Sequence, residues 1–560
     1  MSTTTAPRLS AGEASSALSS AQSNAFTGTL DLVRFILHRD RIRFPAWIFG
    51  IMMLVVYVAN AIGFILDDAT LQSFAIMASN PIMGLIGGPG YGFENISVPI
   101  IIVGVYGLYM MLATALMSIT TISRHTRIEE QTGRGELVRA NVVGRHAQLT
   151  ATLIVVTAMN ILASCAVAGA FYFSGARPDS FAPVLLFSAS VGAVGLVFGG
   201  VAAITAQLSP YSRTGSGIAG IVLAMAFVLR GLGDMSAVQH GNLTWMSWLS
   251  PLGWSQQTAP LVFDRWWPLL YSLGLTAVLI AIAYRLLDRR DLGSGIFSER
   301  FGSARAPRWL GNALALAYRL QRPSLVGWSV SLFLLGIILG AFSQPMLEAM
   351  DDLPPEIAQL MGGSGSVLDG YLGFMALYFG IMVAVYAILS IQYLKAEEQG
   401  TRAEPILAAA VGRGQWLGAW TAVSACGSLV LMALAGAGTA IGAAITGVGD
   451  WQLYGETVLG HTIQVAPVWL LLGLAVALYG SLPRAVGAAW ALFGYGAFMS
   501  LFGQMLQLGS PWQDFSPFSH VGEYPGTEIS WGSFAVLAAL SAGLVAVGVV
   551  GFRRRDLITA

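Results

Sequence analysis

Long uncharged runs of apolar residues alternate with short polar segments along the whole chain. A bilayer core about 30 Å thick needs roughly 20 residues of helix, so each apolar run of about that length predicts a membrane span. The runs cover 45–66, 99–123, 148–173, 181–208, 215–228, 267–283, 326–342, 371–393, 417–448, 465–482, 485–506 and 531–552. The pattern therefore predicts an all-α polytopic membrane protein with twelve transmembrane helices.

Composition supports a membrane location. Only 10% of the residues are charged and 55% are hydrophobic, whereas soluble chains are about 25% charged. The mean hydropathy of +0.68 leaves too little polar surface for a soluble globule of this size. The formal net charge is zero, so no basic field indicates a nucleic-acid partner.

The placement of the charges predicts the orientation. With the N-terminus inside, 26 of the 29 basic residues fall in cytoplasmic segments, whereas the outer loops carry acids such as Asp67, Asp68, Asp351 and Asp352. The positive-inside rule therefore predicts that both termini are cytoplasmic. The single lysine among 29 basic residues, with abundant Ala and Gly, is typical of a high-GC bacterium and indicates a bacterial plasma membrane.

The chain contains an internal duplication. EEQTGRGELVRANVVGR at 129–145 and EEQGTRAEPILAAAVGR at 397–413 align without a gap and share nine of seventeen residues. RRDL at 289–292 recurs at 554–557. Because six spans are an even number, two six-helix halves enter the membrane in the same sense and form a parallel repeat. We expect a disordered cytoplasmic tail at 1–28, a first half at 29–292, a cytoplasmic linker at 293–305 and a second half at 306–560.

A basic amphipathic stretch precedes the first span of each half. TLDLVRFILHRDRIRF occupies 29–44, and LGNALALAYRLQRP occupies 310–323. Both predict a helix lying in the cytoplasmic interface, with an ordinary basic flank of the span as the alternative. Two outer segments rich in Trp and Pro, 231–267 and 511–525, predict short re-entrant helices.

The ionisable residues limit how transport is powered. No predicted span carries Asp, Glu, Lys or Arg near its middle, which argues against a proton or sodium antiporter and against an embedded hydrolase. A nucleotide-binding P-loop needs a Gly-Lys-Ser/Thr end, but the single lysine, Lys395, stands in QYLKAEEQ. Cys165, Cys426 and the histidines are scattered singly and predict no metal site. Active transport would therefore take its energy from a separate subunit.

The duplicated loops are the predicted place for that subunit to bind. The positive-inside rule favours Lys and Arg and does not ask for glutamates. Two copies that keep Glu-Glu-Gln, Arg, Glu and Val-Gly-Arg in one register therefore favour a short amphipathic helix that docks a protein partner, over a solvated loop.

These loops resemble the loop between the second and third spans of bacterial type-two ABC exporter permeases, in particular the large tandem drug or polyketide-antibiotic exporters. The resemblance covers essentially the whole chain. It implies that each loop is a coupling helix seated in a cleft of the ATPase, and that one tandem permease binds two copies of a separate ABC ATPase, which holds ATP and Mg. The coupling residues implied are Glu129, Glu130, Arg134, Glu136 and Arg145, with Glu397, Glu398, Arg402, Glu404 and Arg413. No catalytic residue, metal or cofactor is expected in this chain.

Apolar residues of the second and fifth spans are candidates for the substrate path. Tyr106 and Met110 lie on one face of the second span. The alignment of the duplicated loops pairs them with Phe374 and Tyr378 in the second half. The resemblance adds residues of the fifth spans. The full set is Tyr106, Met110, Met225, Phe227, Phe374, Tyr378, Met382, Phe493 and Phe498. Such adaptable apolar surfaces suit varied lipophilic compounds, although packing between helices or contact with membrane lipid explains them equally well.

These features predict the membrane-spanning permease subunit of an ATP-driven exporter of lipophilic compounds such as drugs, antibiotics or lipids. An ion-coupled twelve-helix drug antiporter is the first alternative and would need an embedded carboxylate. A membrane enzyme acting on lipids is the second and would need a cluster of histidines or carboxylates. A noncatalytic assembly or signalling subunit is a third. The sequence does not identify the substrate.

Overall fold

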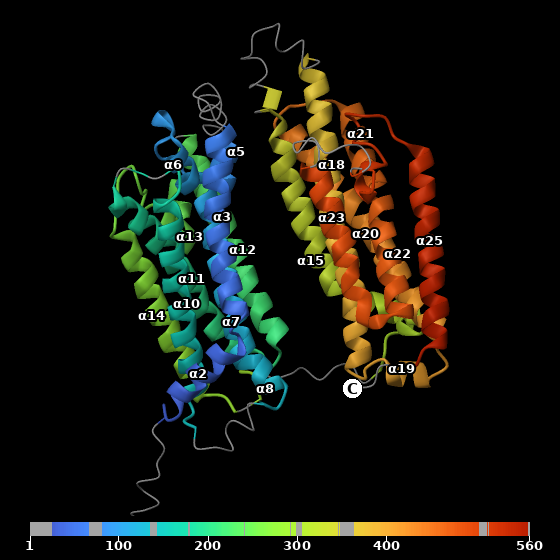
Figure 1. The fold of residues 1–560 in the computed structure, drawn as a ribbon, viewed down its shortest axis with the longest axis horizontal. Coiled ribbons are helices and arrows are strands. Elements are labelled where there is room, and N and C mark those ends of the chain that lie inside the picture. Colours follow the sequence, from blue (N-terminus) through green and yellow to red (C-terminus); the bar gives the residue numbers. More distant parts are fainter. Residues whose placement is uncertain are drawn as a thin grey trace, which may run out of the picture. The chain divides into compact units, whose positions relative to one another are not determined.

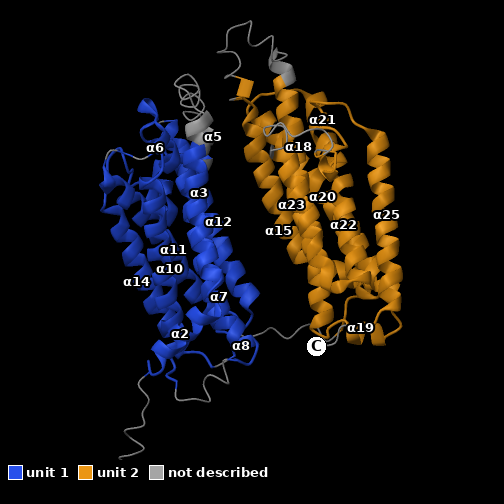
Figure 2. Ribbon diagram, in the orientation of Figure 1, with its two compact units in different colours: residues 1–301 blue, residues 302–560 orange. Residues whose placement is uncertain are grey.

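The computed structural model describes residues 25–65, 81–134, 143–297 except 177, 179, 240 and 292, 305–347 except 345, 363–502, and 512–557 except 513. Every regular element in these ranges is a helix. The chain divides into two compact units, Met1–Phe301 and Gly302–Ala560 (Figure 2). In each unit the long helices run side by side (Figure 1). The prediction of an all-α polytopic membrane protein is confirmed.

The first unit contains six helical segments long and apolar enough to cross a membrane. They are α3 (Arg43–Ile65), the continuous segment Val98–Gln131, α10 (Ala147–Tyr172), α11 (Phe181–Leu208), α12 (Ser212–Val238) and α14 (Pro268–Asp288). The second segment joins α6 (Val98–Ile101), η2 (Ile102–Tyr106), α7 (Gly107–Ser123), η3 (Arg124–Ile128) and α8 (Glu129–Gln131). Shorter elements are α2 (Thr29–Arg39), α5 (Pro81–Ile86), η1 (Phe93–Asn95), η4 (Thr244–Leu249) and α13 (Pro251–Gln256).

The second unit contains five such segments. They are α15 (Ala313–Ala341), α18 (Gly363–Gln399), α20 (Arg413–Ile445), the pair α21 (Trp451–Ile463) and α22 (Val465–Ser481), and α25 (Trp531–Arg554). Shorter elements are η5 (Arg308–Leu310), α19 (Glu404–Ala408), η6 (Pro483–Ala488), α23 (Ala489–Phe502) and η7 (Pro517–Ser519).

The described residues thus hold eleven candidate spans, so the predicted count of twelve is not confirmed. The predicted span 485–506 corresponds to α23, which is 14 residues long, and the end of that span, 503–506, lies outside the described residues. Residues 1–24 of the predicted tail also lie outside them. Two short helices, η4 and α13, occupy the predicted outer segment 231–267, and α12 extends into its beginning.

The two predicted interfacial helices differ in whether they are separate from the first long helix of their unit. In the first unit α2 is a separate helix that ends at Arg39 with Asp40 as its C-cap, and α3 begins at Arg43. In the second unit the prediction of a separate helix is wrong, because residues 313–323 are the first part of α15, which runs through Pro323. Aligning Pro45 with Pro323 places Tyr318 where Asp40 stands. The carboxylate that anchors the break in the first unit, described below, is therefore absent at this position of the second.

Glycines bring some helices into backbone contact. On α15, Gly336 and Gly340 form a G-x-x-x-G pair that faces a second such pair, Gly438 and Gly442, on α20. A Cβ added at Gly336 would lie 2.6 Å from the carbonyl oxygen of Ala435. In lipid there is no hydrophobic driving force between helices. Small residues allow the close packing that holds such helices together.

Candidate functional site

The two Glu-Glu pairs lie at the ends of long helices. Glu129 and Glu130 form the start of α8, which continues from α7 through the π-helical turn η3. Glu397 and Glu398 occupy the last turn of α18. Positive φ angles follow at Gly133 (71°) and Thr401 (58°). The predicted short helix is α19 in the second copy, whereas residues 135–142 of the first copy, with Glu136, lie outside the described residues.

Each second glutamate is paired with the end of the last long helix of its own unit. Glu130 accepts hydrogen bonds from Arg290 at 2.6 and 3.0 Å, and Glu398 accepts hydrogen bonds from Arg555 at 2.6 and 2.7 Å. Arg290 and Arg555 are both the second arginine of an RRDL segment. The two pairs are therefore repeat-equivalent, and we call them the Glu–Arg clamps.

The Glu–Arg clamps are buried. The side chains of Glu130 and Arg290 are 5% and 4% exposed, and those of Glu398 and Arg555 are 2% and 13% exposed. Additional donors differ between the copies, since Arg127 donates to Glu130 at 2.8 Å and the Tyr479 hydroxyl donates to Glu398 at 2.6 Å.

Pairing with Glu398 also affects the pKa of Arg555. Burial tends to lower it, but the hydrogen bonds and charge of Glu398 outweigh burial and raise it. The guanidinium of Arg555 is therefore held in its charged form, which is the form that the second clamp requires.

The far end of each loop is tied to the same place. Arg145 donates to the carbonyl oxygens of Leu287 and Asp288, both at 2.9 Å, and Arg413 donates to the carbonyl oxygen of Arg555 at 2.6 Å. Both ends of each duplicated loop are thus attached to the end of α14 or α25. A push on either loop would act directly on that helix.

The first glutamates differ between the copies. Glu129 pairs with Arg39 at the end of α2, whereas Glu397 pairs with Arg402 of its own loop at 2.8 and 2.9 Å. The elbow between α2 and α3 is held by Asp40, which accepts hydrogen bonds from Arg124 and lies 2.8 Å from Nε2 of His125. In the described residues, the first copy is therefore joined to a preceding separate helix, α2.

Four of the nine described coupling residues face outward. Arg134, Arg145 and Glu404 are exposed, and the side chain of Arg402 is 58% exposed, while the four paired glutamates are turned inward. The sequence alone did not predict the partners of Glu130 and Glu398, which are Arg127, Arg290, Tyr479 and Arg555. The repeated RRDL segment was the available signal, because it recurs at nearly the same spacing from the loop in both halves.

The candidate substrate-path residues fall into two groups. Met110 is fully buried in the first unit, and Tyr106, Phe227, Met382 and Phe493 are partly buried against the cores of their units. Four side chains present substantial surface, namely Met225 (59% exposed), Phe498 (47%), Phe374 (38%) and Tyr378 (36%). These four come from α12, α23 and α18, the helices of the predicted second and fifth spans.

One prediction about embedded charge is wrong. Arg230, expected in an outer loop, lies inside α12 because this helix runs to Val238. Its guanidinium pairs with Asp234 at 3.3 Å and donates to the carbonyl oxygen of Leu85 at 2.9 Å, and Asp234 accepts a hydrogen bond from Ser247. Both charged side chains are fully buried. They are retained because each neutralises the other and the pair makes further hydrogen bonds to α5 and η4, although Nε of Arg230 has no partner.

Comparison with known proteins shows the family of this chain. The family model described as multidrug efflux system permease Rv1217c, C-terminal domain, matches residues 33–286 and 310–553, one segment in each unit. The chain belongs to this family. The multidrug efflux system permease protein Rv1217c of Mycobacterium tuberculosis (strain ATCC 25618 / H37Rv) is 36% identical over 543 residues, which cover 95% of this chain and 96% of that relative. The protein is therefore a multi-pass membrane protein of a multidrug efflux permease family.

Proposed function

We propose that the chain is the membrane-spanning permease subunit of an ATP-driven ABC exporter of lipophilic compounds, and that it works with two copies of a separate ABC ATPase subunit. The observation that carries the proposal is the pair of repeat-equivalent Glu–Arg clamps. They hold two loops of the same design against the ends of α14 and α25. Two docking loops in one chain suit two copies of one partner.

The loop geometry supports a division of labour. The exposed charges of Arg134, Arg402 and Glu404 would contact the ATPase. The buried clamps would carry the resulting displacement into the last long helix of each unit, since a buried ion pair with several hydrogen bonds resists separation. ATP and Mg would belong to the partner, and movement of one six-helix unit against the other would open the path.

The exposed apolar residues support a lipophilic substrate. Met225, Phe374, Tyr378 and Phe498 offer flexible or aromatic contact surface, and such surfaces adapt to different ligands. The printed name of the relative, a multidrug efflux permease, agrees with varied substrates. With 26 of 29 basic residues on the side of the duplicated loops, we place these loops and both termini in the cytoplasm, at a bacterial plasma membrane.

The buried pair of Arg230 and Asp234 is the observation that favours the alternative, an ion-coupled antiporter. A carrier carboxylate must exchange protons with water, but Asp234 is fully buried and holds Arg230 and Ser247. We therefore assign this pair to fastening α12 against α5 and η4. Under the proposed function, Asp234→Asn destabilises the outer end of α12 but leaves transport dependent on ATP. Loss of proton-driven efflux in this variant would favour the antiporter.

Affinity purification of the full-length protein from its own host, followed by mass spectrometry, tests the proposal. We expect a P-loop ATPase at about two copies per chain. Because they reverse exposed loop charges, Arg134→Glu and Glu404→Arg should weaken its retention about tenfold, roughly 1.4 kcal/mol, without changing the thermal midpoint. Arg34→Glu is the matched control, since this arginine is 83% exposed on α2 and lies outside both loops. If no ATPase is retained, or if the loop variants retain it as the control does, the proposal is wrong.

A further inference from the structure

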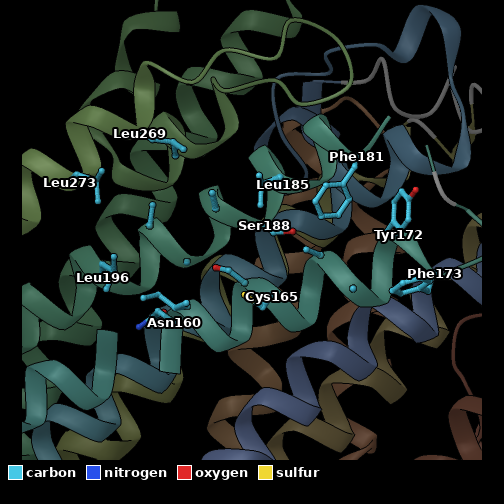
Figure 3. A pocket seen from close by; sticks show the side chains of 17 residues that line it. Asn160, Cys165, Tyr172, Phe173, Phe181, Leu185, Ser188, Leu196, Leu269 and Leu273 are labelled. Carbon is cyan, nitrogen blue, oxygen red and sulfur yellow. The ribbon is translucent and has the colours of Figure 1, made fainter. Parts of the chain in front are cut away.

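A hollow in the first unit lies apart from the duplicated loops and from the candidate substrate path. It encloses about 770 Å³ between α10, α11 and α14. Figure 3 shows Tyr172, Phe173 and Phe181 gathered at one end, and Leu196, Leu269 and Leu273 toward the other. This volume lies within the range of about 300–1,000 Å³ typical of small-molecule sites. We call it the α10–α14 groove.

Small residues create the hollow. On α11 the lining residues Ala189, Gly192 and Ala193 have little or no side chain, which leaves space beside this helix. A Cβ added at Gly192 would overlap the hydroxyl of Ser164, so α10 and α11 are in close contact at this point. The groove is thus bounded by a tight helix contact on one side and by leucines of α14 on the other.

The repeat shows that helix packing alone does not require a hollow here. Pro210 and Pro483 both follow the fourth long segment of their units, and aligning these two prolines pairs Leu196 with Trp469. Aligning the two RRDL segments in the same way pairs Leu269 with Phe534.

Those counterparts carry large rings that pack against each other. The rings of Trp469 and Phe534 lie 6.5 Å apart, and the indole nitrogen of Trp469 donates to the carbonyl oxygen of Ala425 at 3.1 Å. Trp469 thereby bridges α20, α22 and α25, the counterparts of α10, α11 and α14. The first unit carries leucines at both positions, and the groove is open.

The chemistry of the groove selects an apolar occupant. Among the described residues that line it, none is charged. The amide nitrogen of Asn160, at the deep end, donates to Ser118 and to the carbonyl oxygen of Val156, at 2.9 and 2.8 Å. At the edge, Ile161, Leu185 and Leu273 are 56%, 46% and 51% exposed. Because these residues belong to membrane-spanning helices, the medium at the opening is lipid hydrocarbon.

The groove is long enough to span one leaflet. Along α10, the lining runs from Asn160 to Phe173, a rise of about 20 Å, which exceeds the roughly 15 Å of half the hydrocarbon core. Tyr172 ends α10, where tyrosines usually meet the lipid headgroups, and its ring packs against those of Phe173 and Phe181. We propose that the α10–α14 groove binds one acyl chain of a phospholipid from the leaflet opposite the duplicated loops, with its headgroup beside these aromatic residues. The proposal does not rest on how transport is powered.

A photoreactive phospholipid with a diazirine on one acyl chain tests the proposal on the full-length protein in nanodiscs. We expect label concentrated on groove residues of α10, α11 and α14. The variant Leu196→Trp/Leu269→Phe copies the second unit into the first, and it should reduce this label about tenfold because the added rings occupy the space of the chain. Leu270→Phe is the control, since Leu270 neighbours the groove on α14, is 68% exposed and does not line the groove. Equal labelling of groove residues in the filled variant and the wild type would overturn the proposal.

The two native cysteines give a second measurement that requires no filling of the groove. Cys165 lines the groove, whereas Cys426 is exposed on α20 and does not line it. In detergent, adding phospholipid to delipidated protein should slow the reaction of a maleimide with Cys165, measured in Cys426→Ala. The reaction of Cys426, measured in Cys165→Ala, should be unaffected. Equal slowing at both cysteines would mean general coating by lipid and would contradict the proposal.

Discussion

Replacing Glu130 with Gln is the most informative single change at the Glu–Arg clamps. Gln keeps the size of the side chain and removes its charge. Two guanidiniums, Arg127 and Arg290, then lose their shared carboxylate. Their side chains are only 1% and 4% exposed, so water replaces little of the lost interaction.

The structure predicts different costs for the two copies. Removing one partner of a buried ion pair costs about 3–5 kcal/mol, because an uncompensated charge remains. We expect Glu130→Gln to fall in that range. Glu398→Gln leaves one guanidinium, Arg555, which is 13% exposed and still contacts Tyr479 through its ring face at 5.1 Å. We therefore expect a smaller cost of about 1.5–3 kcal/mol, the value of a hydrogen bond to a charged group.

Thermal unfolding of the purified full-length protein, followed by intrinsic fluorescence, measures both effects. A loss of about 3 kcal/mol should lower the midpoint by roughly 6 °C or more for a unit of this size. Asp31→Asn is the control, since its pair with Arg34 is 3.9 Å long and over 80% exposed on both sides, and it should leave the midpoint unchanged. The double variant Glu130→Gln/Arg290→Gln should recover part of the loss, because one buried charge is removed with its partner. If Glu130→Gln behaved like Asp31→Asn, the clamp would not be a buried ion pair and the reasoning would fail.

Two further outcomes follow from the packing and the elbow. Gly340→Val should cost about 3 kcal/mol or more in unfolding experiments, because its Cβ would overlap the Thr439 carbonyl, whereas Gly327→Ala on the same helix has open space and should be neutral or stabilising. For Asp40, burial tends to raise the pKa, but hydrogen bonds and charge from Arg124 and His125 bring it below the ordinary value of 3.8. Stability from this carboxylate is therefore present above pH 3.8 and lost as the pH falls below that value, so Asp40→Asn should flatten the acid limb of the thermal midpoint curve. An unchanged acid limb would contradict this assignment.

Most of the helices could be predicted from the sequence, because a long apolar run in lipid has no alternative to a helix. The edges were less predictable. The prediction ended the fifth span at residue 228, but α12 continues because the charges of Arg230 and Asp234 compensate each other within one helix. Likewise, hydropathy does not distinguish α2, which ends at Arg39, from the start of α15, since the difference depends on contacts made by one carboxylate, Asp40.

The duplicated loops illustrate the same limit at the candidate site. Their register was readable from the repeat, but the direction of each side chain was not. Glu130 and Glu398 are positioned by arginines that lie far away in the chain, at the end of the last long helix of each unit, and pairing over such a separation leaves no local pattern. The α10–α14 groove was equally hidden, because it depends on leucines at two positions where the other half carries Trp469 and Phe534.

The central claim is that transport is powered by a separate ATPase acting through the duplicated loops. Its most direct test is efflux of a lipophilic fluorescent dye from proteoliposomes that contain the full-length protein, with and without the co-purified ATPase. The account predicts efflux only when both the ATPase and ATP-Mg are present, and none under a proton gradient alone. Efflux driven by a proton gradient in the absence of any ATPase would contradict it.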